Sequence, residues 1–67
     1  MNYPRIRELR EENEVKQKVI ADYLHIAQNT YSQYENGRRE IPIEIFSKLA
    51  DYYRTTIDYL ANRVDQR

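Results

Sequence analysis

The sequence has no cysteine, a single histidine, one glycine and two prolines in 67 residues. The absence of cysteine excludes disulfides and thiolate metal ligands, and one histidine cannot form a metal site by itself. We therefore expect neither a metal nor a cofactor. Helix-breaking residues are few, Glu, Arg, Lys, Leu and Ala are abundant, and no segment alternates apolar and polar residues long enough for a strand. The composition therefore predicts an all-α protein.

Long apolar runs are also missing. No segment approaches the roughly 18 apolar residues of a membrane span, and the start, MNYPRIREL, lacks the apolar stretch of a signal peptide. We expect a soluble cytoplasmic protein. A chain of this length predicts a single domain, which we place at residues 3–64, followed by a polar end at residues 65–67 that frays.

The sequence has no net charge, because its eleven basic and eleven acidic residues cancel. Nucleic-acid-binding modules usually carry a basic excess, so the balance by itself argues against a polyanionic partner. The distribution is uneven, however, and bases outnumber acids between residues 16 and 39. These bases are Lys16, Lys18, Arg38 and Arg39. Any positive surface is local, and the alternative that these charges only solvate helix faces stays open at this point.

Five segments have the periodicity or the boundary residues of helices. Pro4 suits the first turn of one helix, a second fits residues 17–24, and a third starts at Gln28 after a short connection. Pro42 can open a fourth helix, and Thr56 can cap a fifth. The positions expected on inward faces or their edges are Ile6, Leu9, Arg10 and Asn13; Val19, Ile20, Tyr23 and Leu24; Ile43, Phe46, Leu49, Ala50 and Tyr53; and Ile57, Leu60, Ala61 and Val64. The sequence predicts a compact five-helix bundle.

The third predicted helix has an unusual outer face. An advance of about 100° per residue places four uncharged polar side chains together, and they are Gln28, Asn29, Ser32 and Gln33. Tyr31 and Tyr34 fall on the opposite, inward side. An Asn or Gln amide presents a donor and an acceptor together and can pair bidentately with adenine in the major groove. The helix alone also fits a polar surface or a protein-contact face.

The residues around this helix favour DNA. Gly37 suits the position just past a helix end, where φ is positive, and Arg38 and Arg39 can reach phosphates from the following turn. Gln17 starts the second helix, where free N–H groups and the helix dipole favour a phosphate. The pattern thus combines a base-reading helix with phosphate contacts at its ends.

Four segments carry a resemblance to a known family, and they are IRELREE, KQKVIADYL, QNTYSQYENGRREIP and KLADYYRTTIDYL. In order and spacing they resemble the Cro/CI-type helix-turn-helix, or XRE family, of lambda-repressor-like domains in phage repressors and bacterial regulators. The resemblance implies a transcriptional repressor that binds a near-palindromic operator in double-stranded DNA as a homodimer, with the third helix in the major groove.

Carried over by position, the resemblance assigns roles to single residues. Base edges would be read by Gln28, Asn29, Ser32 and Gln33. Phosphates would be held by Gln17, Asn36, Arg38 and Arg39. A structural ion pair would join Arg10 to Glu35.

The sequence also departs from the family pattern. Lys16 and Ala27 stand where the family often has a capping Ser or Thr, so two N-caps are absent. His25 stands where the family usually has glycine. It must either accept a positive φ or impose a different turn. Gln33 replaces a Lys or Arg that is common at this position, which reduces the attraction for phosphate there.

The last predicted helix is our candidate for the dimer interface. We expect Ile57 and Leu60 to close the core, and Tyr59 and Val64 to face a second copy. Two-fold pairing would place the recognition helices about 34 Å apart, one turn of DNA. Of the seven tyrosines, we expect Tyr31, Tyr34 and Tyr53 to point inward, and Tyr3, Tyr23 and Tyr52 to lie at edges.

Two other function classes remain to be weighed. One is a protein-interaction module on the same fold, such as an antitoxin or an antagonist of another regulatory protein. A domain of that kind needs neither the amide face nor the arginines after Gly37. The other is an enzyme, which we do not expect because there is no cysteine, no second histidine and no glycine-rich phosphate loop.

Overall fold

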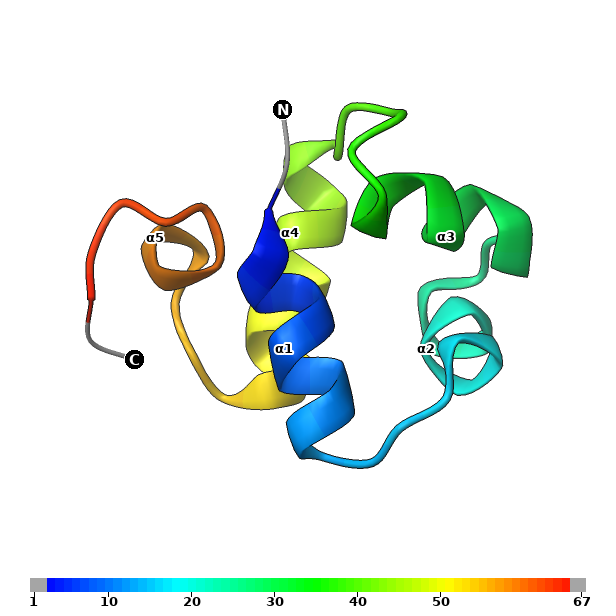
Figure 1. Cartoon of the computed structure of the whole chain (residues 1–67), viewed down its shortest axis with the longest axis horizontal. Helices are drawn as coiled ribbons and strands as arrows, with labels where there is room; N and C mark the ends of the chain where they lie inside the picture. Colours follow the sequence, from blue (N-terminus) through cyan, green and yellow to red (C-terminus); the bar gives the residue numbers. More distant parts are fainter. Residues whose placement is uncertain (1–2, 66–67) are drawn as a thin grey trace.

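The computed structural model describes residues 3–65, and these form five helices and no strand. They are α1 (Pro4–Glu12), α2 (Gln17–Leu24), α3 (Gln28–Glu35), α4 (Ile43–Tyr53) and α5 (Ile57–Leu60). In Figure 1, α1 lies in front of α4 at the centre, α2 and α3 lie on one side of this pair, and α5 lies on the other. The predicted all-α five-helix fold is confirmed.

The helix α1 begins at Pro4, as expected, because the missing N–H of proline is not needed in a first turn. Ile6 and Leu9 on its inner face are buried, and Arg10 beside them is partly buried. After the helix ends, the Asn13 side-chain amide donates to the Leu9 carbonyl at 2.8 Å. Ile6, Leu9 and Arg10 thus lie on the predicted inner face of α1, whereas Asn13, also predicted there, is exposed beyond the end of the helix.

A tight turn at His25 joins α2 to α3. His25 has φ 59° and ψ 41°, so it adopts the left-handed conformation rather than a different turn. Its N–H donates to the Asp22 carbonyl at 3.1 Å, and the Ile26 N–H donates to the Ala21 carbonyl at 3.0 Å. These bonds occupy carbonyls at the end of α2 that would otherwise lack partners. The turn keeps the geometry that glycine usually provides, at the cost of a left-handed histidine.

Neither α2 nor α3 has a side-chain N-cap, as predicted from Lys16 and Ala27. Helices this short are marginal on their own, so tertiary packing must stabilise them. The core that supplies this packing consists of Ile6, Leu9, Ile20, Ala21, Leu24, Tyr31, Tyr34, Ile45, Phe46, Leu49, Ala50 and Leu60. Both tyrosines of α3 lie in it, which confirms their predicted inward position.

The inner face of α4 differs from the prediction, and that of α2 is more narrowly defined than predicted. In α4, Ile43 is 62% exposed and Ile45 is buried instead. The buried face of α4 includes Ile45, and a residue two positions earlier points about 200° away from it. In α2, Val19 is 50% exposed and Tyr23 41% exposed, while Ala21 is buried. Val19 and Tyr23 therefore form an exposed apolar edge of α2, the position predicted for Tyr23.

The helix α5 is shorter than predicted. Thr56 caps it as expected, with its hydroxyl accepting from the Tyr59 N–H at 3.0 Å. Leu60 is fully buried and Ile57 partly buried. The helix then ends, because Asn62 adopts a left-handed conformation with φ 62°, which asparagine tolerates better than most residues.

The prediction that Val64 continues the helical stripe of α5 is therefore wrong. Val64 lies beyond the helix and is 42% exposed. Fraying was predicted for residues 65–67, of which residues 66 and 67 lie outside the described residues. Asp65 itself is exposed, and its Oδ1 lies 3.4 Å from Arg5 Nη2.

The other aromatic side chains line the edges of the core. The Tyr3 and Phe46 rings are 5.0 Å apart edge to face, and the Tyr23 and Tyr52 rings are 4.9 Å apart. Tyr3, Tyr23 and Tyr52 thus lie at the edges of the core, as predicted, and Phe46 belongs to the core itself. Tyr53, predicted to point inward, is only partly buried, although its hydroxyl is covered.

Candidate nucleic-acid interface

The outer face of α3 carries the four predicted base-reading residues. Gln28 and Asn29 are exposed, and Ser32 and Gln33 are partly exposed. The opposite face is anchored by Tyr31, which is fully buried. The amide and hydroxyl groups of these four residues therefore lie on the solvent-facing side of α3.

A cavity of about 350 Å³ lies between the start of α2 and the outer face of α3. It is lined by Gln17, Gln28, Asn29 and Ser32. Gln17 was predicted as a phosphate contact on a separate element, but the fold brings it together with three of the predicted base readers. The cavity is lined by uncharged donors and acceptors, which suits hydrogen bonding to bases or phosphates.

Arg10 and Glu35 form an ion pair between α1 and the end of α3. Arg10 Nε lies 2.6 Å from Glu35 Oε2, and Nη2 lies 3.3 Å from Oε1. The Glu35 side chain is only 1% exposed and the Arg10 side chain 13%. Such a bidentate pair gives directional strength, but its attraction must offset the loss of hydration of both charges.

Arg10 and Glu35 shift each other's pKa values. Burial by itself would raise the pKa of the Glu35 carboxyl, but the hydrogen bonds and charge of Arg10, the nearby Tyr31 hydroxyl and the Gln17 amide outweigh it. The pKa of Glu35 is therefore lowered. Its carboxylate in turn raises the pKa of Arg10. Both groups are thus held in their charged forms.

Two further hydrogen bonds connect this ion pair to the start of α2, and neither was predicted from the sequence. Arg10 Nη1 donates to the Val15 carbonyl at 2.9 Å, and Gln17 Nε2 donates to Glu35 Oε1 at 3.2 Å. No spacing in the sequence indicates them, since they join residues of different elements. The carboxylate of Glu35 thus contacts side chains of α1 and α2 from the end of α3.

The segment after α3 carries the other predicted phosphate contacts. Gly37 has φ 72°, the positive value expected just past the helix. The Arg38 N–H donates to the Gln33 carbonyl at 3.0 Å, and the Arg38 and Arg39 side chains are exposed. Asn36 Nδ2 lies 3.4 Å from Ser32 Oγ. The spacing of four residues could have predicted this contact between a predicted base reader and a predicted phosphate contact.

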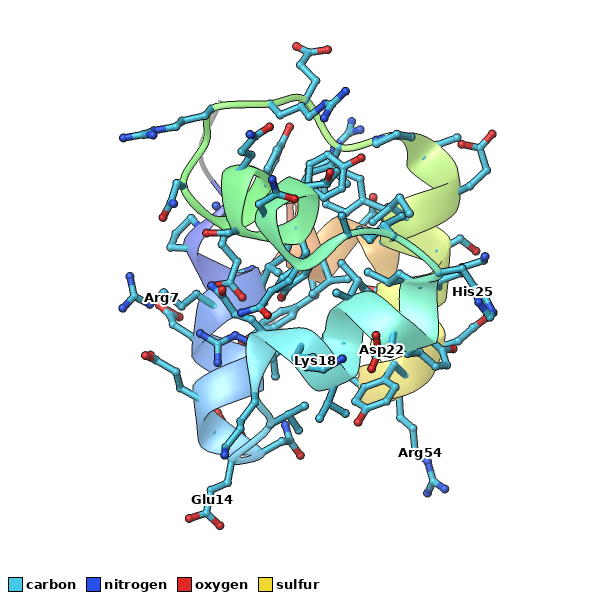
Figure 2. All side chains as sticks on the ribbon, turned by 90° about the vertical axis from the view of Figure 1, so that its right-hand side faces the viewer. Arg7, Glu14, Lys18, Asp22, His25 and Arg54 are labelled. Atoms are coloured by element: carbon cyan, nitrogen blue, oxygen red, sulfur yellow. The ribbon has the colours of Figure 1, made fainter. Side chains whose placement is uncertain are left out.

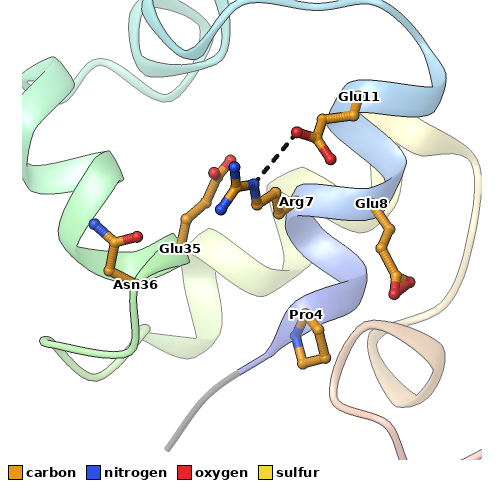
Figure 3. A pocket seen from close by; sticks show the side chains of 6 residues that line it. All are labelled: Pro4, Arg7, Glu8, Glu11, Glu35 and Asn36. Atoms are coloured by element: carbon orange, nitrogen blue, oxygen red, sulfur yellow. Dashed lines mark hydrogen bonds and ion pairs between the residues drawn. The ribbon is translucent and has the colours of Figure 1, made fainter.

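A second cleft of about 320 Å³ bounds this surface on the side of α1. Its lining residues are Pro4, Arg7, Glu8, Glu11, Glu35 and Asn36. In Figure 3 a dashed line joins Arg7 Nε to Glu11 Oε2, and these two atoms lie 3.3 Å apart. The acidic groups make this cleft unfavourable for phosphate, so we place the edge of the candidate interface near Asn36.

The positive charge at α2 is reduced by a neighbouring acid. Lys18 Nζ lies 3.2 Å from Asp22 Oδ2, and Figure 2 shows both side chains on the outward side of α2. Both are well exposed, and an exposed pair one turn apart contributes only about 0.3–0.5 kcal/mol. Lys18 therefore adds little net positive charge to this surface, and the exposed bases that remain are Lys16, Arg38 and Arg39.

The C-terminal segment is held by Arg5, a contact that the sequence did not indicate. Arg5 Nη1 donates to the Tyr59 carbonyl at 2.9 Å and also to the Val64 carbonyl. Its guanidinium carbon lies 4.2 Å from the centre of the Tyr59 ring, within the range of a cation–π contact. One face of Tyr59, a predicted dimer residue, is therefore covered within the domain.

The described part of the chain also lacks two other kinds of site. No three His, Cys, Asp or Glu side chains within it lie close enough together to hold a metal ion. None of its helices has the length and the apolar character needed to cross a membrane.

The arrangement of α2 and α3 defines the class of the protein. Two short helices are joined by a tight left-handed turn, and the second presents a polar outer face while its inner face packs in the core. This is a helix-turn-helix domain, a DNA-binding architecture. A family model described as helix-turn-helix matches residues 6–60. The chain belongs to this family, as its resemblance to Cro/CI-type domains predicted.

Two curated proteins are similar to the chain. One is the HTH-type transcriptional regulator AnsR of Bacillus subtilis (strain 168), 40% identical over 67 residues, which cover all of this chain and 58% of that protein. The other is the cryptic phage CTXphi transcriptional repressor RstR of Vibrio cholerae, 34% identical over 58 residues, which cover 87% of this chain and 52% of that protein. The chain thus spans about half the length of these relatives. No solved structure matches it significantly.

Proposed function

We propose that this domain is a sequence-specific regulator of transcription, acting as a repressor, that places α3 in the major groove of double-stranded DNA. The observation that carries the proposal is the exposed face of α3, where Gln28 and Asn29 stand free beside Ser32 and Gln33. A solvated face is more often built from Glu and Lys, which favour helix more strongly. Adjacent amides have the donor and acceptor pattern that reads base edges.

Phosphate contacts at both ends of the recognition unit would fix its position on the duplex. At one end Gln17 lines the cavity beside α3. At the other end Asn36, Arg38 and Arg39 are exposed after the helix. Contacts to phosphates carry no sequence information directly but set the register of the helix in the groove. We therefore divide the residues into base readers on α3 and phosphate contacts at the start of α2 and in the segment after α3.

A homodimer is the expected binding unit, and its operator should be a near-palindrome. One small module has few base contacts, and two-fold pairing doubles them with recognition helices about 34 Å apart. We keep the C-terminal segment as the interface. Val64 is 42% exposed there, and Tyr59 retains a partly exposed surface beside Arg5. The AnsR and RstR proteins are named as a regulator and a repressor of transcription, which supports the same kind of function here.

Selection of bound sites from random double-stranded DNA is the experiment that tests this function. We expect enrichment of a near-palindrome with half-sites one helical turn apart. If four to eight phosphates are contacted, log K should fall with log salt at a slope of roughly −4 to −7. The proposal would be contradicted if no sequence is enriched and the affinity for DNA does not change with salt concentration.

A protein-interaction module, such as an antitoxin or an antagonist, is the second candidate. The exposed apolar edge of α2 favours it, since Val19 is 50% exposed and Tyr23 41% exposed. Exposed apolar side chains that lie together suit a protein partner. The selection experiment separates the candidates, because a domain used only for protein contact would enrich no DNA sequence.

A further inference from the structure

The side chain of Gln17 lies between the buried ion pair and the exposed face of α3. Its Nε2 donates to Glu35 Oε1 at 3.2 Å, and the same side chain lines the cavity shared with Gln28, Asn29 and Ser32. A primary amide has two N–H donors and one carbonyl acceptor. Because one N–H is used inside the protein, one N–H and the carbonyl are left for a ligand in the cavity.

Glu35 determines which way this amide points. An ionised carboxylate only accepts hydrogen bonds, so the nitrogen of the Gln17 amide, and not its oxygen, must face Glu35. The carboxylate itself is fixed, because Arg10 donates to both of its oxygens, at 2.6 and 3.3 Å. The bond from Arg10 to the Val15 carbonyl, at 2.9 Å, also holds the chain just before α2. Gln17 is therefore oriented by a rigid acceptor.

We propose that Glu35 is a positioning residue, which directs the free N–H of Gln17 to a phosphate of the DNA backbone lying against this cavity. The inference rests on the DNA-binding function proposed above and deepens it. The four residues that line the cavity carry no charge. The nearby charge of Glu35 is buried and paired with Arg10. The side chains that line this cavity thus offer the phosphate neutral donors.

A neutral contact and a charged contact respond differently to salt. The salt dependence of DNA binding follows the number of phosphates that Lys and Arg neutralise, because these release counterions. Loss of an uncharged donor should therefore lower the affinity by the same factor at every salt concentration. Loss of Arg38, in the segment after α3, should make the salt dependence shallower.

The first experiment measures binding of the full chain to a B-form duplex of mixed sequence over a range of salt concentrations. We expect Gln17→Ala to weaken binding roughly tenfold per protomer, the factor for one hydrogen bond to a charged group, with an unchanged salt slope. Arg38→Ala is the matched control and should reduce the slope by about 1 per protomer. Unchanged affinity for Gln17→Ala, or a slope reduced as in the control, would overturn the proposal.

The second experiment examines Gln17 in the free protein by NMR exchange of side-chain amide protons. The Gln17 amide should exchange more slowly than that of Gln28, which is exposed on α3. Glu35→Gln should remove this difference. If that variant unfolds, the exchange rates of Gln17 and Gln28 in the unaltered protein still test the proposal. Equal rates for the two amides would refute the positioning by Glu35.

The two experiments separate failure of the inference from failure of the proposed function. If the unaltered protein binds no duplex at low salt, the DNA function fails, and the phosphate contact of Gln17 fails with it. If the protein binds duplex normally but Gln17 exchanges as fast as Gln28, only the positioning role of Glu35 is wrong. Slow exchange of Gln17 together with a salt-independent loss in Gln17→Ala supports the proposal.

Discussion

Arg10 and Glu35 join the first helix to the last residue of α3 through two hydrogen bonds of 2.6 and 3.3 Å. The Glu35 side chain is almost completely removed from water, and the Arg10 side chain is partly buried. We expect each single substitution, Arg10→Met or Glu35→Met, to lower the free energy of unfolding by about 3–5 kcal/mol, because it leaves one buried charge without its partner. The double substitution should cost less than either single one. Urea unfolding of all four proteins measures this coupling, and simple additivity of the two losses would contradict it.

The lowered pKa of Glu35 predicts how stability depends on pH. A carboxyl whose pKa is lower in the folded state stabilises the fold above its unfolded pKa, near the ordinary value of 4.5. This contribution is lost as the pH falls through the folded value. We expect the free energy of unfolding to decrease with acidification below about 4.5, and Glu35→Gln to show a flatter decrease. Unfolding measured at a series of acidic pH values tests this, and parallel curves for both proteins would exclude Glu35 as the cause.

The left-handed histidine between α2 and α3 predicts a stabilising substitution. A residue with a Cβ pays roughly 1–2 kcal/mol in this conformation, and glycine avoids that cost. His25→Gly should therefore raise the thermal unfolding temperature, offset in part by the greater entropy of glycine in the unfolded chain. His25→Ala is the matched control, since it removes the imidazole and keeps the Cβ, and it should not stabilise. An equal gain in both variants would assign the effect to the imidazole instead.

The division between base readers and phosphate contacts predicts different sequence profiles for two variants. Gln33→Ala should lose about 1–3 kcal/mol on the preferred site and relax one base position. Arg38→Ala should weaken binding to all sequences similarly. Binding of each variant to a set of sites with single base changes tests the difference. The same profile for both variants would show that the division is wrong.

The fold was largely predictable, because helix boundaries depend on local residues. Pro4, Gly37 and Thr56 marked boundaries through the properties of single side chains, and the structure has each of them where the sequence placed it. The inner face of α3 was equally predictable, because a short amphipathic helix has only one face that can pack. The error at Ile43 arose because periodicity alone does not fix how a helix rotates against its neighbours.

The site was less predictable, because its contacts join residues of different elements. The bond between Gln17 and Glu35 spans eighteen positions in the chain, and that between Arg5 and the Tyr59 carbonyl spans fifty-four. The left-handed Asn62 was also missed, and it removed Val64 from the predicted helical stripe. Asparagine adopts this conformation in some contexts only, so the residue type alone did not reveal it.

The contacts of Arg5 with the C-terminal segment suggest where a fluorescent label can be attached. Its contacts with Tyr59, Val64 and Asp65 keep the last described residues beside α1. In Figure 1 this segment lies on the side of the molecule opposite α3. A fluorophore attached through a cysteine placed at Asp65 would therefore sit away from the amide face and beside the proposed dimer interface. Since the sequence has no cysteine, one substitution gives a uniquely labelled protein for fluorescence measurements of dimer formation.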